Sequence, residues 1–327
     1  MTAQLVDSFG RVHRDLRISV TDRCNFRCTY CMPAEGLEWV PRDDLLTFEE
    51  IARLARIMVE RYGVNGIRLT GGEPTVRANL PVLVKMLAEL DTDLAMTTNG
   101  VSLPLLAGDL RAAGLRRVNV SLDSLQASRF AELTRRDSLD RVLDGIDAAI
   151  AAGFDPVKVN CVVMRGLNDD EIADFVDFGR RKGVEVRFIE FMPLDADGIW
   201  TNDLVVGVDE ILARVTDACP VEPVERTSAP ATRYRFADGS GSVGIVASVS
   251  DSFCSTCDRV RLTADGQFRN CLFAVTETDV RALLRSGASD DEIGVALEGS
   301  VASKWAGHQI NRVNFIKPRR SMSQIGG

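Results

Sequence analysis

The chain has 327 residues, of which 45% are hydrophobic and 26% charged, enough for one large core with an appended region or for two domains. Its formal net charge is −8 at pH 7, which excludes a general electrostatic attraction to nucleic acid or to an anionic membrane. No stretch approaches the roughly 18 consecutive apolar residues of a membrane span, and the N-terminus lacks an apolar signal region. We therefore expect a cytoplasmic protein with no nucleic-acid partner and no membrane partner.

Short β-branched runs alternate with amphipathic helical segments, which is typical of βα units around a parallel sheet. The clearest helix spans residues 47–62, because Thr47 and Glu50 form a capping box and Gly63 ends the segment. Further helices are predicted over residues 139–152 and 170–181. The predicted strands cover residues 16–20, 66–70, 94–98, 117–122, 157–163 and 184–191.

Six βα units are fewer than the eight of a closed barrel. We therefore predict an α/β fold, a partial (βα)6 TIM-like barrel, with its site at the carboxyl ends of the strands. Residues 1–215 are expected to form this barrel and residues 216–327 a C-terminal region. The chain has only two histidines, so the usual Ser-His-Asp, Cys-His and H-E-x-x-H sites are not available.

Three cysteines directly after the first predicted strand, Cys24, Cys28 and Cys31, have the spacing C-x3-C-x2-C. Three thiolates can hold three irons of a four-iron cluster and leave the fourth iron open to a small molecule. The alternatives are a disulfide with a spare thiol, or zinc. A structural zinc site needs four nitrogen or sulfur ligands, and no other Cys or His occurs in the next hundred residues. We favour the cluster.

A second group, Cys254, Cys257 and Cys271, has the spacing C-x2-C-x13-C. The segments 259–262 and 267–272, on either side of an Asp-Gly turn, are predicted to form a hairpin that returns Cys271 to the other two. A structural zinc knuckle is the alternative, and the missing fourth ligand counts against it. Of the two remaining cysteines, Cys161 lies in an apolar run and is expected to be a buried thiol, and Cys219 has no assigned function.

Several basic residues interrupt apolar strands. Arg17, Arg68 and Lys158 lie inside predicted strands, and Arg259 and Arg261 alternate so that both emerge on one face of a hairpin strand. Most basic residues lie on the solvent-exposed surface and have no specific role. A charge within an apolar strand, however, needs a partner or a cavity, and arginine suits phosphate because it makes bidentate hydrogen bonds.

Most of the other candidate motifs follow predicted strands. They are Gly71-Gly72-Glu73-Pro74, Thr97-Thr98-Asn99-Gly100, Ser121-Leu122-Asp123-Ser124 and Glu190-Phe191-Met192-Pro193. The first of these can be read as a simple strand-ending turn, and Met192 as core filler. Their common position at strand ends, beside the cysteine loop, favours a functional interpretation.

The loop from Cys24 to Cys31 resembles the signature of the radical S-adenosylmethionine (SAM) superfamily. Its neighbourhood, from Arg17 to Gly36, resembles the GTP 3',8-cyclase (molybdenum cofactor biosynthesis protein A) family, and the resemblance extends to Gly327. It implies two 4Fe-4S clusters, one on each cysteine group. The first would bind S-adenosyl-L-methionine and cleave it to a 5'-deoxyadenosyl radical, and the second would bind the purine of GTP.

The same resemblance implies roles for individual residues. Contacts with SAM would come from Tyr30, Gly72, Ser121 and Met192. Contacts with GTP would come from Arg17, Arg68, Thr97, Lys158, Arg259, Val260 and Arg261. Catalytic roles would fall to Cys24, Cys28, Cys31, Arg259, Arg261, Gly326 and Gly327. The last two residues form a tail that physics alone would leave frayed, but which the resemblance places in the active cavity.

The implied reaction removes the ribose 3' hydrogen of GTP, joins C3' to guanine C8 and yields 3',8-cyclo-7,8-dihydro-GTP, the first step of molybdenum cofactor biosynthesis. The implied partners are GTP, an electron donor and cyclic pyranopterin monophosphate synthase as the next enzyme, with a homodimer possible. Two alternatives stay open at this point. One is a radical enzyme with another substrate, such as a peptide, and the other is a non-enzymatic zinc-binding interaction protein.

Overall fold

The computed structural model describes residues 3–195, 197–310 and 315–326. In this part of the chain a twelve-stranded sheet has the order β12-β11-β10-β1-β2-β3-β4-β5-β6-β9-β8-β7. The first six strands are β1 Asp15–Ser19, β2 Gly66–Thr70, β3 Asp93–Thr98, β4 Arg117–Ser121, β5 Val157–Val163 and β6 Glu185–Glu190. The other six are β7 Val221–Pro223, β8 Thr232–Phe236, β9 Ser242–Val246, β10 Arg259–Leu262, β11 Gln267–Arg269 and β12 Thr278–Asp279.

Strands β1 to β6 are parallel neighbours in chain order, which confirms the predicted α/β fold and partial barrel. The predicted strands 66–70 and 157–163 coincide with β2 and β5, and the others differ by one residue at one or both ends. The sheet continues beyond these six strands, because β10 pairs in parallel with β1 and β9 pairs in parallel with β6. The C-terminal region therefore extends both edges of the barrel.

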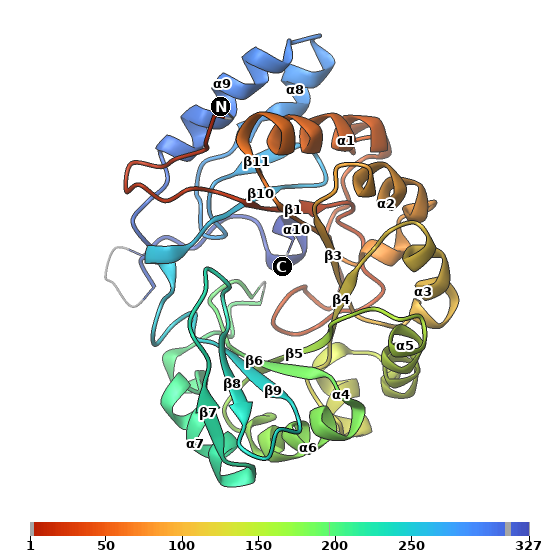
Figure 1. Cartoon of the computed structure of the whole chain (residues 1–327), viewed down its shortest axis with the longest axis vertical. Coiled ribbons are helices and arrows are strands. Elements are labelled where there is room, and N and C mark those ends of the chain that lie inside the picture. The colour runs from red at the N-terminus through yellow and green to blue at the C-terminus, as the bar shows by residue number, and fades with distance from the viewer. Residues whose placement is uncertain (1–2, 196, 311–314, 327) are drawn as a thin grey trace.

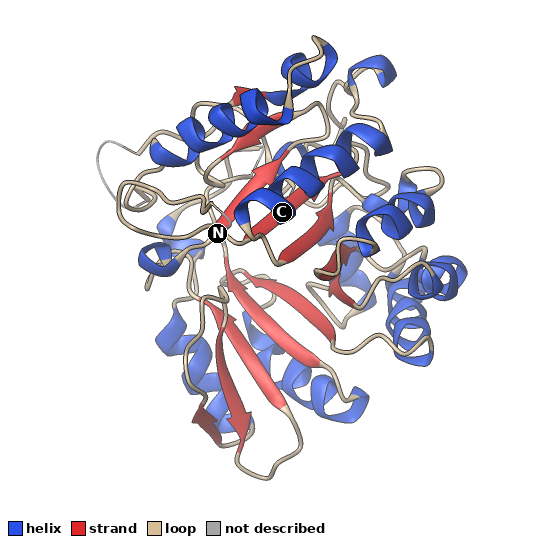
Figure 2. Ribbon diagram, turned by 45° about the horizontal axis from the view of Figure 1, so that its top comes forward, coloured by secondary structure: helices blue, strands red, loops and turns tan. Residues whose placement is uncertain are grey.

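The helices cover the convex face of this curved sheet, and Figure 1 shows them around the outside, with the short helix α10 inside the arc of strands. Figure 2 shows the strands splayed and the barrel open. The helices are α1 Phe48–Arg56, α2 Leu80–Ala88, α3 Leu103–Ala112, α4 Ala127–Thr134, α5 Leu139–Ala151, α6 Ile172–Lys182, α7 Val208–Ala218, α8 Val280–Arg285, α9 Asp290–Ala302 and α10 Met322–Ile325.

Helix α1 begins with the predicted capping box, in which Thr47 and Glu50 each bond the other's backbone N–H. The segment predicted as one helix changes character after Arg56, because residues Ile57–Arg61 form a π-helical turn. Helices α5 and α6 match their predicted ranges within two residues.

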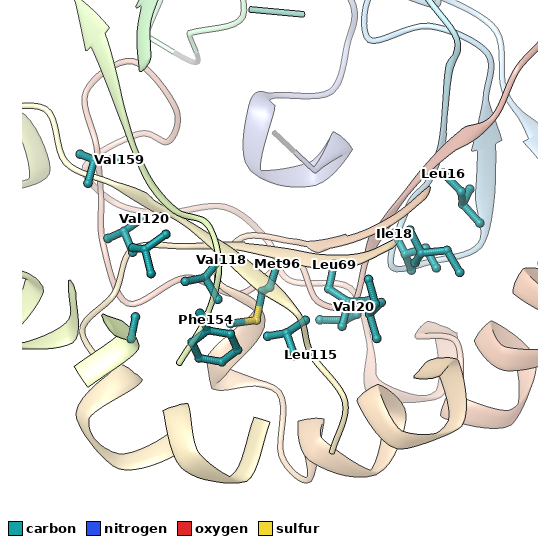
Figure 3. Packing of buried hydrophobic residues seen from close by; sticks show 14 of the residues in the cluster. Leu16, Ile18, Val20, Leu69, Met96, Leu115, Val118, Val120, Phe154 and Val159 are labelled. Atoms are coloured by element: carbon teal, nitrogen blue, oxygen red, sulfur yellow. The ribbon is translucent and has the colours of Figure 1, made fainter. Parts of the chain in front are cut away.

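The hydrophobic core lies between the strands and the helices, and Figure 3 shows part of this layer, with α10 on the other side of the strands. Along β1, Leu16 and Ile18 are fully buried in the core, while Arg17 between them faces the interior of the barrel. This alternation follows from the two-residue period of a strand. Cys161 is buried in the same core, as predicted. Among the described residues, the helices are all too short or too polar to cross a bilayer.

Candidate functional site

The concave face of the sheet encloses a cavity of about 290 Å³ that is open to solvent. Both cysteine groups line it: Cys24, Cys28 and Cys31 in one wall, and Cys254, Cys257 and Cys271 in another. The two groups, about 230 residues apart in sequence, therefore face a common space.

The first cysteine loop follows β1 and is held by the Gly71-Gly72 turn that follows β2. The Gly72 N–H donates to Thr21 O at 2.8 Å, and the Glu73 N–H donates to Arg23 O at 2.8 Å. A Cβ atom on Gly72 would lie 2.5 Å from Asp22 O, closer than real side chains approach backbone. Glycine at this position therefore lets the two loops pack directly against each other.

Glu73 in the same turn ties it to the next strand. Its carboxylate accepts from Thr98 Oγ1 at 2.7 Å and from the Asn99 N–H at 2.6 Å. Glu73 is 1% exposed, and its burial raises the pKa of the carboxyl group. The motif thus binds the ends of three strands together.

The three thiols of the first loop are unoxidised and close enough to interact electrostatically. Burial raises the pKa of Cys24 to about 11 and that of Cys31 to about 12, and raises the pKa of Cys28 as well. A metal ligand must be a thiolate, so loading this site with iron releases protons. The sulfur donor set, three thiols facing one cavity, fits an iron–sulfur cluster with an open iron.

Tyr30 lies between two of these cysteines, and its hydroxyl donates to Asp123 Oδ2 at 2.7 Å. Asp123 is buried just after β4, and it also accepts from the Val162 N–H at 2.8 Å. Burial raises the pKa of Asp123 to about 6, although the bond from Tyr30 opposes this shift. The pair ties the cysteine loop to the opposite wall of the barrel.

The second cysteine group lies at the start of β10 and the end of β11. These strands pair antiparallel, with Arg261 opposite Arg269, which confirms the predicted hairpin and returns Cys271 to the group. Burial raises the pKa of the Cys257 thiol, but the Arg259 and Lys304 charges outweigh it and lower that pKa to about 7. Among the described residues no Cys, His, Asp or Glu side chains are grouped as ligands of a single metal ion. The three sulfurs again fit the corners of a cluster.

A row of arginines crosses the cavity wall between the two cysteine groups. Arg17 on β1 is in register with Arg261 on β10 and with Arg68 on β2, so three guanidinium groups lie side by side on the inner face. Burial and the neighbouring arginines lower the pKa of each, that of Arg68 to about 9. Nε of Arg17 and Nε of Arg68 have no hydrogen-bond partner among the described residues. Such a row is a site for an anion with several charges.

Lys158 does not line the cavity, in contrast to the other predicted phosphate-binding side chains. It faces inward on β5 but pairs with Glu185 at 3.0 Å. Glu185 also accepts from Arg187 Nε at 2.7 Å, and Arg187 does line the cavity. Burial and the Arg187 charge lower the pKa of Lys158 to about 8, while Glu185 opposes them. Lys158 therefore stands behind Arg187 in the wall.

The cavity brings together most of the predicted site residues. Those in its lining are Arg17, Cys24, Cys28, Tyr30, Cys31, Arg68, Gly72, Thr97, Ser121, Met192, Cys254, Cys257, Arg259, Arg261 and Cys271. Val260 does not reach the cavity, because its side chain is fully buried in the core on the other face of β10. Gly326 lies beside the lining, where its carbonyl oxygen accepts a bond from Arg261. Gly327 lies outside the described residues.

Sequence reasoning missed several polar residues of the lining, among them Asn119, Asn160, Arg187 and His308. Arg187 could have been found, since it is a charge within an apolar strand, as Arg68 is. The two asparagines carry no such signal, because uncharged polar residues are common in strands. Oδ1 of Asn160 is buried and has no hydrogen-bond partner among the described residues, which indicates a ligand contact.

Two family models match the chain. Residues 18–179 match the radical SAM superfamily, and residues 184–310 match the molybdenum cofactor synthesis C-terminal family. The first covers β1 to α6 with the first cysteine group, and the second covers the C-terminal strands with the second group.

Relatives named GTP 3',8-cyclase resemble nearly the whole chain. A GTP 3',8-cyclase from Rhodopirellula baltica is 50% identical over 330 residues, covering 99% of this chain and 92% of that protein. A GTP 3',8-cyclase from Mycolicibacterium smegmatis is 50% identical over 331 residues, with the same coverage. Among solved structures, Streptococcus suis SuiB bound to S-adenosylmethionine has a TM-score of 0.61 at 14% identity, covering 87% of this chain and 68% of that chain. At that identity the likeness shows the fold alone, which is that of radical SAM enzymes.

Proposed function

The chain belongs to the GTP 3',8-cyclase family, as a radical SAM enzyme of molybdenum cofactor synthesis, and we propose that its cavity holds GTP between two 4Fe-4S clusters. The row of Arg17, Arg68 and Arg261 between the cysteine groups is the observation that carries this proposal. Three adjacent buried cations repel one another, and the carboxylate beside them, Asp15 at 3.8 Å from Arg17 Nε, offsets only part of their charge. A triphosphate supplies the remaining negative charge.

Cys24, Cys28 and Cys31 would hold the first cluster, with SAM on its open iron. When bound, this pair supplies a 5'-deoxyadenosyl radical that removes the ribose 3' hydrogen of GTP. The chain itself positions SAM and GTP and shields them from solvent. Tyr30, Gly72, Ser121 and Met192 all line the cavity and are proposed to contact SAM.

The triphosphate is proposed to lie along the arginine row, with Arg187 as a further contact and Lys158 behind it. Arginine is suited to this task because its guanidinium group keeps its charge and offers two parallel N–H donors to phosphate oxygens. Cys254, Cys257 and Cys271 would hold the second cluster, against which the guanine base lies. The ribose would then lie on the side of the base toward the first cysteine group, which lines the same cavity.

The C-terminal helix α10 closes part of the cavity. Met322 and Ser323 line it, and the Gly326 carbonyl oxygen accepts from Arg261. A Cβ on Gly326 would lie 2.5 Å from Thr70 Oγ1, so only glycine fits between β2 and Arg261. We propose that the tail holds Arg261 in place beside the substrate. An external electron donor and transfer of the product to cyclic pyranopterin monophosphate synthase complete the proposal.

Anaerobic incubation of the iron-reconstituted chain with SAM, a strong reductant and GTP tests the function, with mass spectrometry of the products. We expect 5'-deoxyadenosine together with a cyclised isomer of GTP. The Cys24→Ala variant should form neither. Formation of 5'-deoxyadenosine with unchanged GTP would point to a radical enzyme with another substrate, and bound zinc with neither product would refute the proposal.

A further inference from the structure

A buried polar network joins the N-terminal segment to the second cysteine loop. Lys304, just after α9, is 3% exposed, and its ammonium nitrogen meets three acceptors. It lies 2.8 Å from His13 Nε2, 2.8 Å from Arg259 O and 3.6 Å from Cys257 Sγ. An ammonium group has three hydrogens, so each acceptor receives one. The lysine is therefore fully bonded in one orientation, with one hydrogen directed at the cysteine sulfur.

His13 makes this orientation possible. Its Nδ1 lies 3.3 Å from Leu5 O and donates to it, which leaves Nε2 as the acceptor for Lys304. His13 is fully buried, and burial together with the Lys304 charge keeps the ring neutral by lowering its pKa to about 4. The ring thus holds the ammonium group in place without adding a charge.

Arg11 holds the same loop by its backbone. Its Nε donates to Asp7 Oδ2 at 2.6 Å, and one Nη donates to Cys254 O at 2.6 Å and to Ala306 O at 2.8 Å. The other Nη donates to Trp305 O at 2.6 Å. Figure 1 shows the N-terminal segment beside the C-terminal chain in this region. The loop from Cys254 to Cys257 is therefore held at both ends, at one by Arg11 and at the other by Lys304.

The first cysteine group lacks a buried lysine of this kind, although the Phe26 N–H donates to Cys24 Sγ at 3.3 Å and the Arg27 charge acts on the same thiol. Among the described residues, no lysine ammonium lies within hydrogen-bond distance of the sulfurs of Cys24, Cys28 or Cys31. The two groups have the same donor set but different surroundings. The difference is a buried ammonium group bonded directly to one sulfur of the second group, where it adds to the Arg259 charge.

We propose that Lys304 is a positioning residue for the second cluster, which makes that cluster easier to reduce than it would otherwise be. Hydrogen bonds and charge at ligand sulfurs set the potential of an iron–sulfur cluster, and a positive charge favours the reduced form because reduction adds an electron. The inference rests on the proposed function, in that Cys257 must be a cluster ligand. It makes Lys304 part of the electronic environment of the substrate's base.

The test uses the full chain carrying Cys24→Ala, Cys28→Ala and Cys31→Ala, so that only the second cluster can form. Iron and sulfide per chain are measured, and the midpoint potential is obtained by redox titration followed by electron paramagnetic resonance. Lys304→Met should retain the cluster but shift its potential downward, by at least a tenfold change in the reduction equilibrium, which is 59 mV for one electron. Lys304→Arg should restore much of the shift. Lys182→Met, at an exposed lysine paired with Asp147, should change nothing.

Lys304→Gln keeps a donor without the charge, and it covers the case in which the methionine variant does not fold, which circular dichroism would reveal. Lys304→Gln should shift the midpoint potential downward by less than Lys304→Met does. Folded Lys304 variants with full iron content and the parental potential would overturn the inference while leaving the proposed function standing. If the triple-alanine protein with native Lys304 binds no iron or sulfide, the second cluster does not exist. That result would overturn both the inference and the proposed function.

Discussion

Three arginines side by side in a cavity wall lower the stability of the unliganded protein. Burial and mutual repulsion lower the pKa of Arg68 to about 9, and its Nε has no hydrogen-bond partner among the described residues. The same features make the row a strong site for a polyanion, because bound phosphate satisfies donors that are otherwise unpaired. Function and stability therefore oppose each other at these positions.

Replacing Arg68 with methionine should raise stability and abolish activity together. Removal of one buried charge is expected to increase the free energy of unfolding by about 1 kcal/mol, which corresponds to about 2 °C in Tm. Thermal unfolding and product formation measured on the same samples check this. The exposed Arg116→Met variant, whose side chain pairs with Asp91 at the surface, serves as control and should change neither. A lower Tm in Arg68→Met would show that the row is already balanced by the protein.

The affinity for GTP should fall as the pH rises above about 8. Burial lowers the pKa of Lys158 to about 8 from its usual 10.5, so this lysine is charged below that pH and neutral above it. Bound triphosphate favours the charged form, and the dissociation constant should grow by up to about tenfold per pH unit once the lysine is neutral. Calorimetric titration with GTP from pH 7 to 9 measures this.

Lys158→Met is the matched control for that titration. It removes the titrating lysine, so any pH dependence that remains comes from GTP or from another group. Its affinity should be weak at pH 7 and change little with pH. An equal pH dependence in both proteins would assign the effect to another group.

The residue patterns in the sequence predicted part of this site. Charges within apolar strands correctly marked Arg17 and Arg68 as inward-facing, because a buried charge needs a cavity or a partner. The same rule placed Lys158 on the inner face but could not show that Glu185, from the neighbouring strand, stands as its partner. Asn119 and Asn160 were missed because a polar uncharged residue in a strand carries no comparable penalty.

At the scale of elements, the turn after β2 determines the shape of the first cysteine loop. The backbone of Gly72 and Glu73 bonds to Thr21 and Arg23, immediately before the first cysteine. The sequence placed this turn at a strand end beside the cysteine loop and favoured a functional role, but the hydrogen bonds between the two loops are a tertiary feature that spacing does not reveal.

Gly72→Ala should displace the cysteine loop and impair the first cluster without unfolding the barrel. The added Cβ would lie 2.5 Å from Asp22 O, and backbone cannot move as a flexible side chain does. We expect about half the iron of the wild type after reconstitution, since the second cluster is unaffected, and no 5'-deoxyadenosine.

Gly108→Ala is the control, because a Cβ there meets nothing within 4 Å in helix α3. It should be neutral or stabilise the helix by about 0.5–1 kcal/mol. Full iron content in Gly72→Ala would show that the loop accommodates the change.

The sequence predicted those elements that a local residue pattern determines. It did not predict features that depend on pairing between strands distant in sequence. The βα alternation and the Thr47–Glu50 capping box are local, and both are present. The parallel pairing of β10 with β1 and of β9 with β6 was not foreseen, because partners more than 50 residues apart share no local signal. These pairings turn six predicted strands into a longer continuous sheet.

For the whole molecule, this continuous sheet bears on the predicted division at residue 215. Separating the two parts would expose the edges of β1 and β6, and unpaired edges associate with other chains. We expect the full chain to unfold in one transition, and a fragment of residues 1–215 to aggregate or remain partly unfolded. Chemical denaturation followed by circular dichroism and by fluorescence checks this. A monomeric fragment with a cooperative transition of its own would instead show that residues 1–215 fold as a separate domain.

The central claim, that the arginine row binds a triphosphate between the two cysteine groups, is tested most directly by comparing the affinities for GTP and guanosine in wild type and Arg17→Met. Each charge-assisted hydrogen bond contributes roughly 1.5–3 kcal/mol, so the wild type should prefer GTP strongly. In Arg17→Met the affinity for GTP should fall by about 10- to 100-fold, while that for guanosine stays unchanged. An equal loss for both ligands, or no loss for GTP, would contradict the account.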